Sequence, residues 1–177
     1  KEDKNLLINR ITKRVLGVDI NPLSTLTARV GYFIAVLPLI TEETSFEIPV
    51  YLGDSAIVGD TINLDGVECY SVITNSSEEP IVTTLPVSLV SNRSFFSKME
   101  TLSKKMIQFD KKRWVDELKK DIKDSDKNQL VIEELEKFAE MLFNLKDEGL
   151  SHTWMRIVSN QMKISSIKSV DIIAGNP

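Results

Sequence analysis

The chain has 177 residues, a formal net charge of −4, 42% apolar and 27% charged residues, one cysteine and one histidine. These values suit one globular domain, or one domain with an insertion. The single Cys69 excludes an internal disulfide and suits a reducing compartment, so we expect a cytoplasmic location. We expect no membrane span, signal peptide or metal site. The negative charge offers no general attraction for nucleic-acid phosphates.

The first predicted elements are a helix, a short strand and a second helix. Apolar residues of 6–11 at helical spacing indicate the first helix, and residues 15–20 predict a buried strand that leads to Asp19. Asn21 is a favourable N-cap, and Pro22 suits the first helical position. Apolar side chains then recur every three or four residues as far as Pro38: Leu23, Leu26, Val30, Phe33, Ile34 and Leu37.

A second strand is predicted over residues 46–52, with Pro49 marking an edge or an irregularity. Gly53 and Asp54 follow it, so a carboxylate again stands at a strand end. If the two strands are parallel neighbours, Asp19 and Asp54 lie at the same edge of the sheet. Such an edge binds the ribose hydroxyls of nucleotide cofactors in Rossmann-like folds, although acidic strand ends are also common in ordinary α/β domains.

The α/β alternation stops near residue 59. Asp65-Gly66 is a turn signal, and the β-branched stretches 67–74 and 81–90 predict a β-hairpin. Ser97 and Glu100 have capping-box spacing and predict the start of a long helix. The inner face of this helix is expected to contain Met99, Leu102, Met106, Phe109, Val115, Leu118 and Ile122.

Two more helices are predicted before the last apolar stretch. The first carries an apolar stripe from Val131 to Leu145 and closes at Gly149, and the second is capped by Ser151. We interpret the stripe as the core of an antiparallel helical pair rather than as an interaction surface. The apolar residues of the second helix are Trp154, Ile157, Val158 and Met162.

Residues 170–174 are apolar and of strand type, and Gly175, Asn176 and Pro177 follow them. We predict a third parallel strand here, which would direct the Asn176 amide outward from the same edge as Asp19. Asn-Pro is also a common way to open a loop, so this motif alone does not establish a site.

These motifs, in this order, resemble the middle of an S-adenosylmethionine-dependent DNA adenine-N6 methyltransferase of the restriction–modification or phage-defence kind. Residues 17–35 are similar to the second motif of that family, and residues 48–55 to its third. Residues 152–160 resemble the helix before the catalytic strand. Residues 170–177 match the start of the catalytic motif, which reads asparagine-proline-proline-aromatic.

The resemblance implies a cofactor site at the two strand ends. Asp19 would accept hydrogen bonds from the ribose hydroxyls of S-adenosylmethionine, and Ile20 would pack on a face of its adenine. Asp54, with Ser55 beside it, would accept a hydrogen bond from the amino group of that adenine.

The resemblance also implies a catalytic pair and a nucleic-acid partner. Asn176 and the backbone at Pro177 would bind the amino group of a target adenine flipped out of double-stranded DNA. The expected catalytic contribution is positioning and hydrogen bonding rather than a strong base.

The implied fold is an incomplete Rossmann-like methyltransferase domain of the α/β class with a β-hairpin and a helical insertion. We divide it into a cofactor-binding part (1–58), a hairpin insertion (59–96), a helical insertion (97–163) and a strand leading to the catalytic motif (164–177). The glycine-rich first motif of the family and the residues expected after Pro177 are not in the sequence. We therefore expect an internal piece of a larger enzyme that is inactive by itself.

In the family, the strand of the first motif lies between the strands predicted at 15–20 and 169–174. Without it, both strands would have an unpaired edge. We expect these edges to pair, either directly or, more readily, with a second copy of the chain.

Two other functions remain open. A nucleotide-dependent oxidoreductase shares the acidic ribose ligand, but that reading explains neither Asp54 nor the terminal Gly-Asn-Pro. Alternatively, the helices of residues 97–162 could form a non-enzymatic interaction module on an α/β scaffold.

Overall fold

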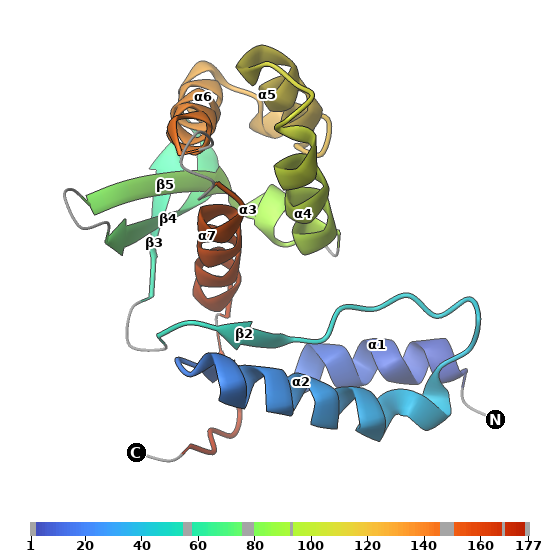
Figure 1. Cartoon of the computed structure of the whole chain (residues 1–177). Coiled ribbons are helices and arrows are strands. Elements are labelled where there is room, and N and C mark those ends of the chain that lie inside the picture. The colour runs from blue at the N-terminus through green and yellow to red at the C-terminus, as the bar shows by residue number, and fades with distance from the viewer. Residues whose placement is uncertain are drawn as a thin grey trace. The chain divides into compact units, whose positions relative to one another are not determined.

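The computed structural model is of mixed α/β type and divides into two compact units, Lys1–Ile57 and Val58–Pro177 (Figure 1). The expected α/β mixture is confirmed, but the described strands form no Rossmann sheet. The first unit holds a parallel sheet of two strands, and the second an antiparallel sheet of three. The structure describes residues 3–54, 58–75, 80–92, 94–145, 151–167 and 169–175.

The first unit consists of α1 (Lys4–Arg14), β1 (Gly17–Asp19), α2 (Pro22–Val36), the 3₁₀ turn η1 (Leu37–Leu39) and β2 (Val50–Leu52). The predicted start of α2 is confirmed, because the Asn21 side chain accepts hydrogen bonds from the backbone of Leu23 and Ser24, and Pro22 opens the helix. The second strand is shorter than predicted. It begins after Pro49, whose carbonyl accepts the Gly17 N–H at 2.9 Å.

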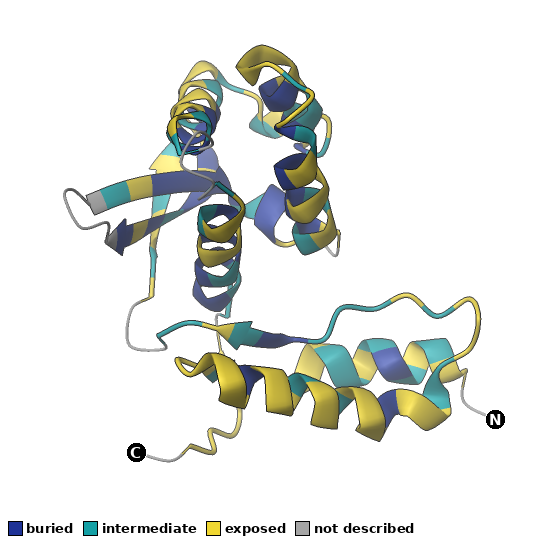
Figure 2. Ribbon diagram, viewed as in Figure 1, coloured by how far each residue is buried: buried dark blue, intermediate teal, exposed yellow. Residues whose placement is uncertain are grey.

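Helix α2 has two faces of different composition. Thr25 and Val36 are buried and Tyr32 is half-buried, and this face packs against β1 and β2. The apolar side chains singled out in the sequence lie about 120° around the helix from it at 3.6 residues per turn. All of them are exposed, from 43% for Phe33 to 70% for Leu23 (Figure 2). Because the two-stranded sheet covers one face only, the most apolar side of α2 has no partner among the described residues of its own unit.

The second unit begins with two β-hairpins, formed by β3 (Asp60–Leu64), β4 (Val67–Asn75) and β5 (Pro80–Pro86). The predicted turn is confirmed: Asp65 and Gly66 have φ of 49° and 86°, as a tight hairpin turn requires. It joins β3 to β4, and β3 was not predicted. The hairpin of β4 and β5 is confirmed, but β5 ends at Pro86, earlier than expected, and α3 (Val87–Val90) follows.

The helices of the second unit are α4 (Phe95–Lys105), α5 (Lys111–Lys119), the 3₁₀ turn η2 (Asp124–Asp126), α6 (Gln129–Asn144) and α7 (Ser151–Ser165). The single long helix predicted from Ser97 is therefore wrong. α4 starts two residues earlier, at Phe95, and a turn separates it from α5, where the Asp110 side chain accepts the Arg113 N–H at 2.8 Å. An N-cap at this position starts a new helix and leaves the turn outside it.

The predicted inner faces of these helices are largely confirmed. Six of the seven residues expected on the first face are buried, and Phe109 is half-buried; on α7, Ile157 is 41% exposed. α6 packs against β5 and α7 against β4, so the core lies between the antiparallel sheet and the helices. Its largest fully buried side chains include Trp114, Tyr70 and Phe95.

The strand predicted for residues 170–174 is not formed. Residues 169–175 adopt no regular structure, and Ile172 and Ile173 are 87% and 85% exposed. In the described part of the chain β1 pairs with β2, and residues 169–175 belong to no strand. A strand needs a neighbour to satisfy its backbone N–H and C=O groups, and an apolar sequence does not supply one.

Gly59 allows a close approach that no other residue would tolerate. Its N–H donates to Ser165 Oγ at 2.8 Å, and an added Cβ would lie 2.5 Å from the Ser71 carbonyl oxygen. We expect Gly59→Ala to lower the unfolding free energy of the second unit by about 1–3 kcal/mol. Gly31→Ala is the matched control, because a Cβ there meets nothing within 4 Å and alanine favours the helix interior. Denaturant unfolding followed by circular dichroism measures both; equal stability of the Gly59→Ala and unchanged chains would contradict the assignment.

Candidate functional site at two strand ends

The carboxyl ends of β1 and β2 lie next to each other. The strands run parallel with Gly17 opposite Val50 and Asp19 opposite Leu52. The Gly53 N–H donates to the Asp19 carbonyl at 3.0 Å, which continues the pairing to the point where β2 ends. The prediction that these strands are parallel neighbours is therefore confirmed, and Asp19 and Gly53-Asp54 follow from the same edge of the sheet.

The Asp19 carboxylate is held by the backbone that follows it. Its Oδ1 accepts the Asn21 N–H at 2.7 Å, and the Thr25 hydroxyl donates to the Asp19 carbonyl at 3.3 Å. Within the part of the chain that the structure describes, Oδ2 accepts no hydrogen bond, and Asp19 is exposed. One carboxylate oxygen thus fixes the side chain while the other is available to hydroxyl or amino donors of a ligand.

The residues beside Asp19 differ in exposure. Ile20 is 71% exposed directly after the strand, so it presents an apolar surface next to a carboxylate. Asp54 is half-buried, and Gly53 precedes it. Ser55, Asn176 and Pro177 lie outside the described residues. The structure therefore brings together Asp19, Ile20 and the Gly53-Asp54 turn, and it does not place the predicted catalytic pair.

Two polar residues support this edge, and neither was assigned this role from the sequence. Thr25 is buried under the start of α2, and the Tyr32 hydroxyl donates to the Val15 carbonyl at 3.2 Å, just before β1. Burial raises the pKa of Tyr32 above its usual value, so the phenol stays neutral and keeps this hydrogen bond. Thr25 and Tyr32 are seven residues apart and therefore lie on one face of α2. The regular apolar residues on another face were the stronger signal in the sequence.

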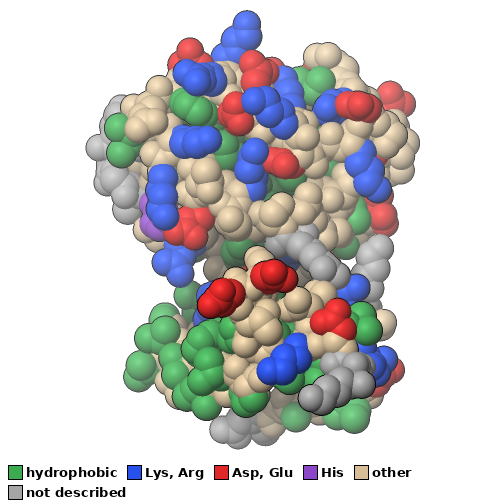
Figure 3. Space-filling view, turned by 90° about the vertical axis from the view of Figure 1, so that its right-hand side faces the viewer, with side chains coloured by type: hydrophobic (Ala, Val, Ile, Leu, Met, Phe, Trp, Pro, Cys, Tyr) green, Lys and Arg blue, Asp and Glu red, His purple; other side chains and the backbone are tan. Residues whose placement is uncertain are grey.

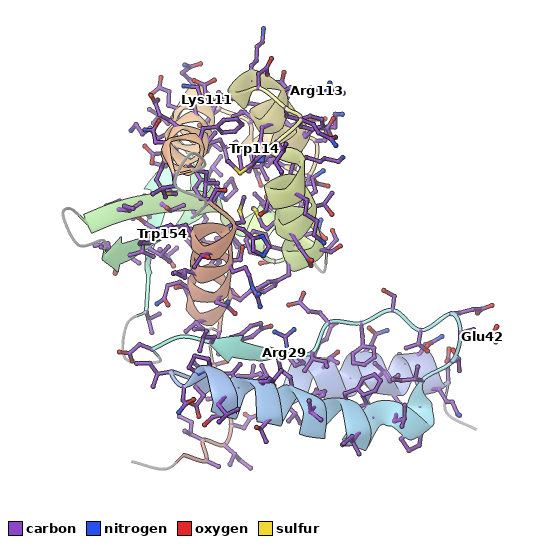
Figure 4. All side chains as sticks on the ribbon, in the orientation of Figure 1. Arg29, Glu42, Lys111, Arg113, Trp114 and Trp154 are labelled. Atoms are coloured by element: carbon purple, nitrogen blue, oxygen red, sulfur yellow. The ribbon has the colours of Figure 1, made fainter. Side chains whose placement is uncertain are left out.

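Arg29 lies on the same side of α2 as Tyr32 and close to β2 (Figure 4). Burial, together with the Glu47 carboxylate, raises the pKa of Tyr51 on β2 far above its usual value. Neither phenol can act as a base at neutral pH. The chemistry available at this edge is therefore hydrogen bonding by carboxylates and apolar contact.

Other groups with reactive side chains are structural. Burial, followed by the carboxylates of Asp126 and Glu134, raises the pKa of Cys69 to about 11, so its thiol is neither exposed nor ionised at pH 7. The Ser103 hydroxyl lies 2.7 Å from Nδ1 of His152 and links α4 to α7. No carboxylate orients the other ring nitrogen of His152 among the described residues, so this pair lacks the third member of a catalytic triad.

The described residues also offer no metal site. Among the residues that the structure describes, no group of three or more His, Cys, Asp or Glu side chains could hold a metal ion. A shallow depression lies elsewhere, between β5 and α6 in the second unit. It is lined by Ile81, Lys137, Glu140, Met141, Asn144 and Leu145.

Comparison of the chain with protein-family models, with curated proteins and with solved structures found no match.

Proposed function

We propose that residues 1–57 form part of the cofactor site of an S-adenosylmethionine-dependent DNA adenine-N6 methyltransferase. The observation that carries the proposal is the pair of parallel strands whose common edge holds Asp19 and Gly53-Asp54. A carboxylate at a parallel strand end binds the ribose of nucleotide cofactors in Rossmann-like sheets, and the resemblance assigns the adenine to the carboxylate at the second strand end. The same two segments carry the sequence motifs that resemble this family.

The described side chains fit the ribose and adenine parts of S-adenosylmethionine. Oδ2 of Asp19 can accept from the ribose hydroxyls, because Oδ1 already accepts the Asn21 N–H and holds the carboxylate in place. Ile20 is exposed beside it and can cover a face of the adenine. Asp54 follows the second strand end and can accept from the adenine amino group, with Ser55 next to it.

The methionine part of the cofactor would be held by a glycine-rich segment, which is not among the 177 residues. When bound, S-adenosylmethionine supplies an electrophilic sulfonium methyl group. The proposal therefore concerns a longer polypeptide that supplies this segment, and the 177 residues alone are expected to be inactive.

Asn176 and Pro177 are proposed to bind the substrate base. The Asn176 side-chain oxygen and the backbone carbonyl at Pro177 would accept hydrogen bonds from the amino group of an adenine flipped out of double-stranded DNA. These two hydrogen bonds would pull the amino nitrogen toward tetrahedral geometry and direct its lone pair toward the methyl group that S-adenosylmethionine would supply.

Asp19→Ala and Asp54→Ala should each weaken S-adenosylmethionine binding by about 1–3 kcal/mol, because each removes a charge-assisted hydrogen bond. The measurement is titration calorimetry on a polypeptide that includes the glycine-rich segment. Asp60→Ala is the control, since Asp60 is an exposed carboxylate at the start of β3 in the other unit. Unchanged cofactor affinity in both strand-end variants would reject the proposed site.

A further inference from the structure

The exposed side of α2 has the residue spacing of a helix-pairing surface. Leu23, Leu26, Val30, Phe33 and Leu37 follow one another in alternating steps of three and four, and Ile34 lies beside them. We call these six residues the α2 stripe. Steps of three and four are the heptad pattern by which two helices pack knobs into holes. The stripe points away from the face that packs on β1 and β2.

The α2 stripe is as large as the largest apolar patch that a typical monomer exposes. The exposed fractions of its members range from 43% to 70%. Six large apolar side chains exposed to this extent amount to roughly 600 Å², at the upper limit for the largest patch of a typical monomer. Two copies facing each other would bury roughly 1,200 Å², which reaches the lower limit of stable protein interfaces. Figure 3 shows hydrophobic side chains gathered at the lower left of the view, with few charged ones among them.

Charge also favours a second copy as the occupant. α2 contains no acidic residue, and its single cation, Arg29, is half-buried on the face toward β2. Two copies of the stripe can therefore meet without like charges opposite each other. Such an interface would be isologous, with the same surface used on both copies.

A lipid bilayer is the competing occupant. The stretch Pro22–Leu39 is long and apolar enough to cross a membrane by length and composition alone. These criteria are also met by core helices of globular proteins, and they do not decide a location. Arg29 near the middle of the stretch is costly in a bilayer centre.

We propose that two copies of this chain associate through the α2 stripe to form a homodimer. Val30 lies at the centre of the stripe, which runs from residue 23 to residue 37. Val30 therefore lies opposite Val30 of the second copy if the two helices pair in parallel. The same holds if they pair antiparallel with the whole stripe buried. The proposal is independent of the methyltransferase assignment.

The test is the mass of the 177-residue chain in sedimentation equilibrium. We expect a dimer of twice 20.0 kDa, that is 40.0 kDa. Val30→Glu and Val30→Lys should each raise the dimer dissociation constant by about 100-fold or more, because two like charges would meet in an apolar interface. An equimolar mixture of the two variants should form a heterodimer, since opposite charges then face each other. Ile107→Glu, at an 82% exposed position of the second unit, should leave the dimer unchanged.

Three results would overturn the proposal. The first is an unchanged chain that stays monomeric at a concentration about 100-fold above the dissociation constant of a typical micromolar association. The second is a dimer that persists in both Val30 variants, which would indicate pairing elsewhere, for instance through strand edges. The third is a monomer that binds phosphatidylcholine vesicles and loses that binding in Val30→Glu, which would assign the stripe to lipid. Circular dichroism confirms that the variants are folded, as expected for a half-exposed position.

Discussion

Trp114→Ala should lower the unfolding free energy of the second unit by about 3–5 kcal/mol, the usual cost of removing a fully buried large aromatic side chain. Trp114 is 0% exposed and points between α4, α5 and α6 (Figure 4). Its ring meets Phe138 and Phe143 edge to face, at centroid distances of 5.9 and 6.5 Å. Its Nε1 donates to the Leu102 carbonyl at 3.0 Å and so connects α5 to α4.

Denaturant unfolding of the chain measures this loss, and two further variants separate its causes. Trp114→Phe keeps most of the apolar volume and removes the hydrogen bond to Leu102, so it should cost less, about 1–3 kcal/mol. Ile107→Ala removes an 82% exposed side chain and should change stability by less than about 0.5 kcal/mol. A Trp114→Ala chain as stable as the unchanged one would contradict the packing described for these helices.

Asn176→Ala should abolish methylation in the proposed enzyme and leave cofactor binding intact. The side-chain oxygen of Asn176 is proposed to accept a hydrogen bond from the reacting amino group, and an alanine cannot replace it. Loss of one such positioned acceptor costs about 10²–10³ in rate in comparable sites, and base positioning is lost as well.

Methyl transfer to a duplex containing adenine is measured with labelled cofactor, and calorimetry measures S-adenosylmethionine affinity in parallel. Asp19→Ala is the complementary variant, since it should weaken cofactor binding without removing the acceptor for the base. Methylation by Asn176→Ala at a rate near that of the unchanged enzyme would end the assignment of the catalytic motif, whatever the outcome for Asp19.

Local interactions were predictable where a few neighbouring residues decide the structure. Asn21 and Pro22 start α2 because one side-chain oxygen and one missing N–H satisfy the first helical turn. Asp65-Gly66 forms the turn between β3 and β4 because both residues tolerate positive φ. The parallel pairing of β1 and β2, which places the candidate site, followed from the helix between them.

Burial patterns were predictable only where a partner is present. The apolar face of α6 is buried as its spacing indicated, because the sheet and neighbouring helices cover it. The equally regular α2 stripe is exposed, since the two-stranded sheet contacts a different face of the helix. Periodicity identifies a face that favours burial, but the tertiary structure decides whether anything covers it.

The sequence by itself determined the start of α2 and the turn at Asp65-Gly66, because each depends on contacts within a few residues. The break between α4 and α5 was missed although Asp110, the N-cap of α5, is a local signal, and the tertiary structure decided how the two helices pack around Trp114. It likewise decided that residues 170–174 form no strand among the described residues. Their apolar sequence favours a strand, but a strand exists only where another backbone offers matching N–H and C=O groups.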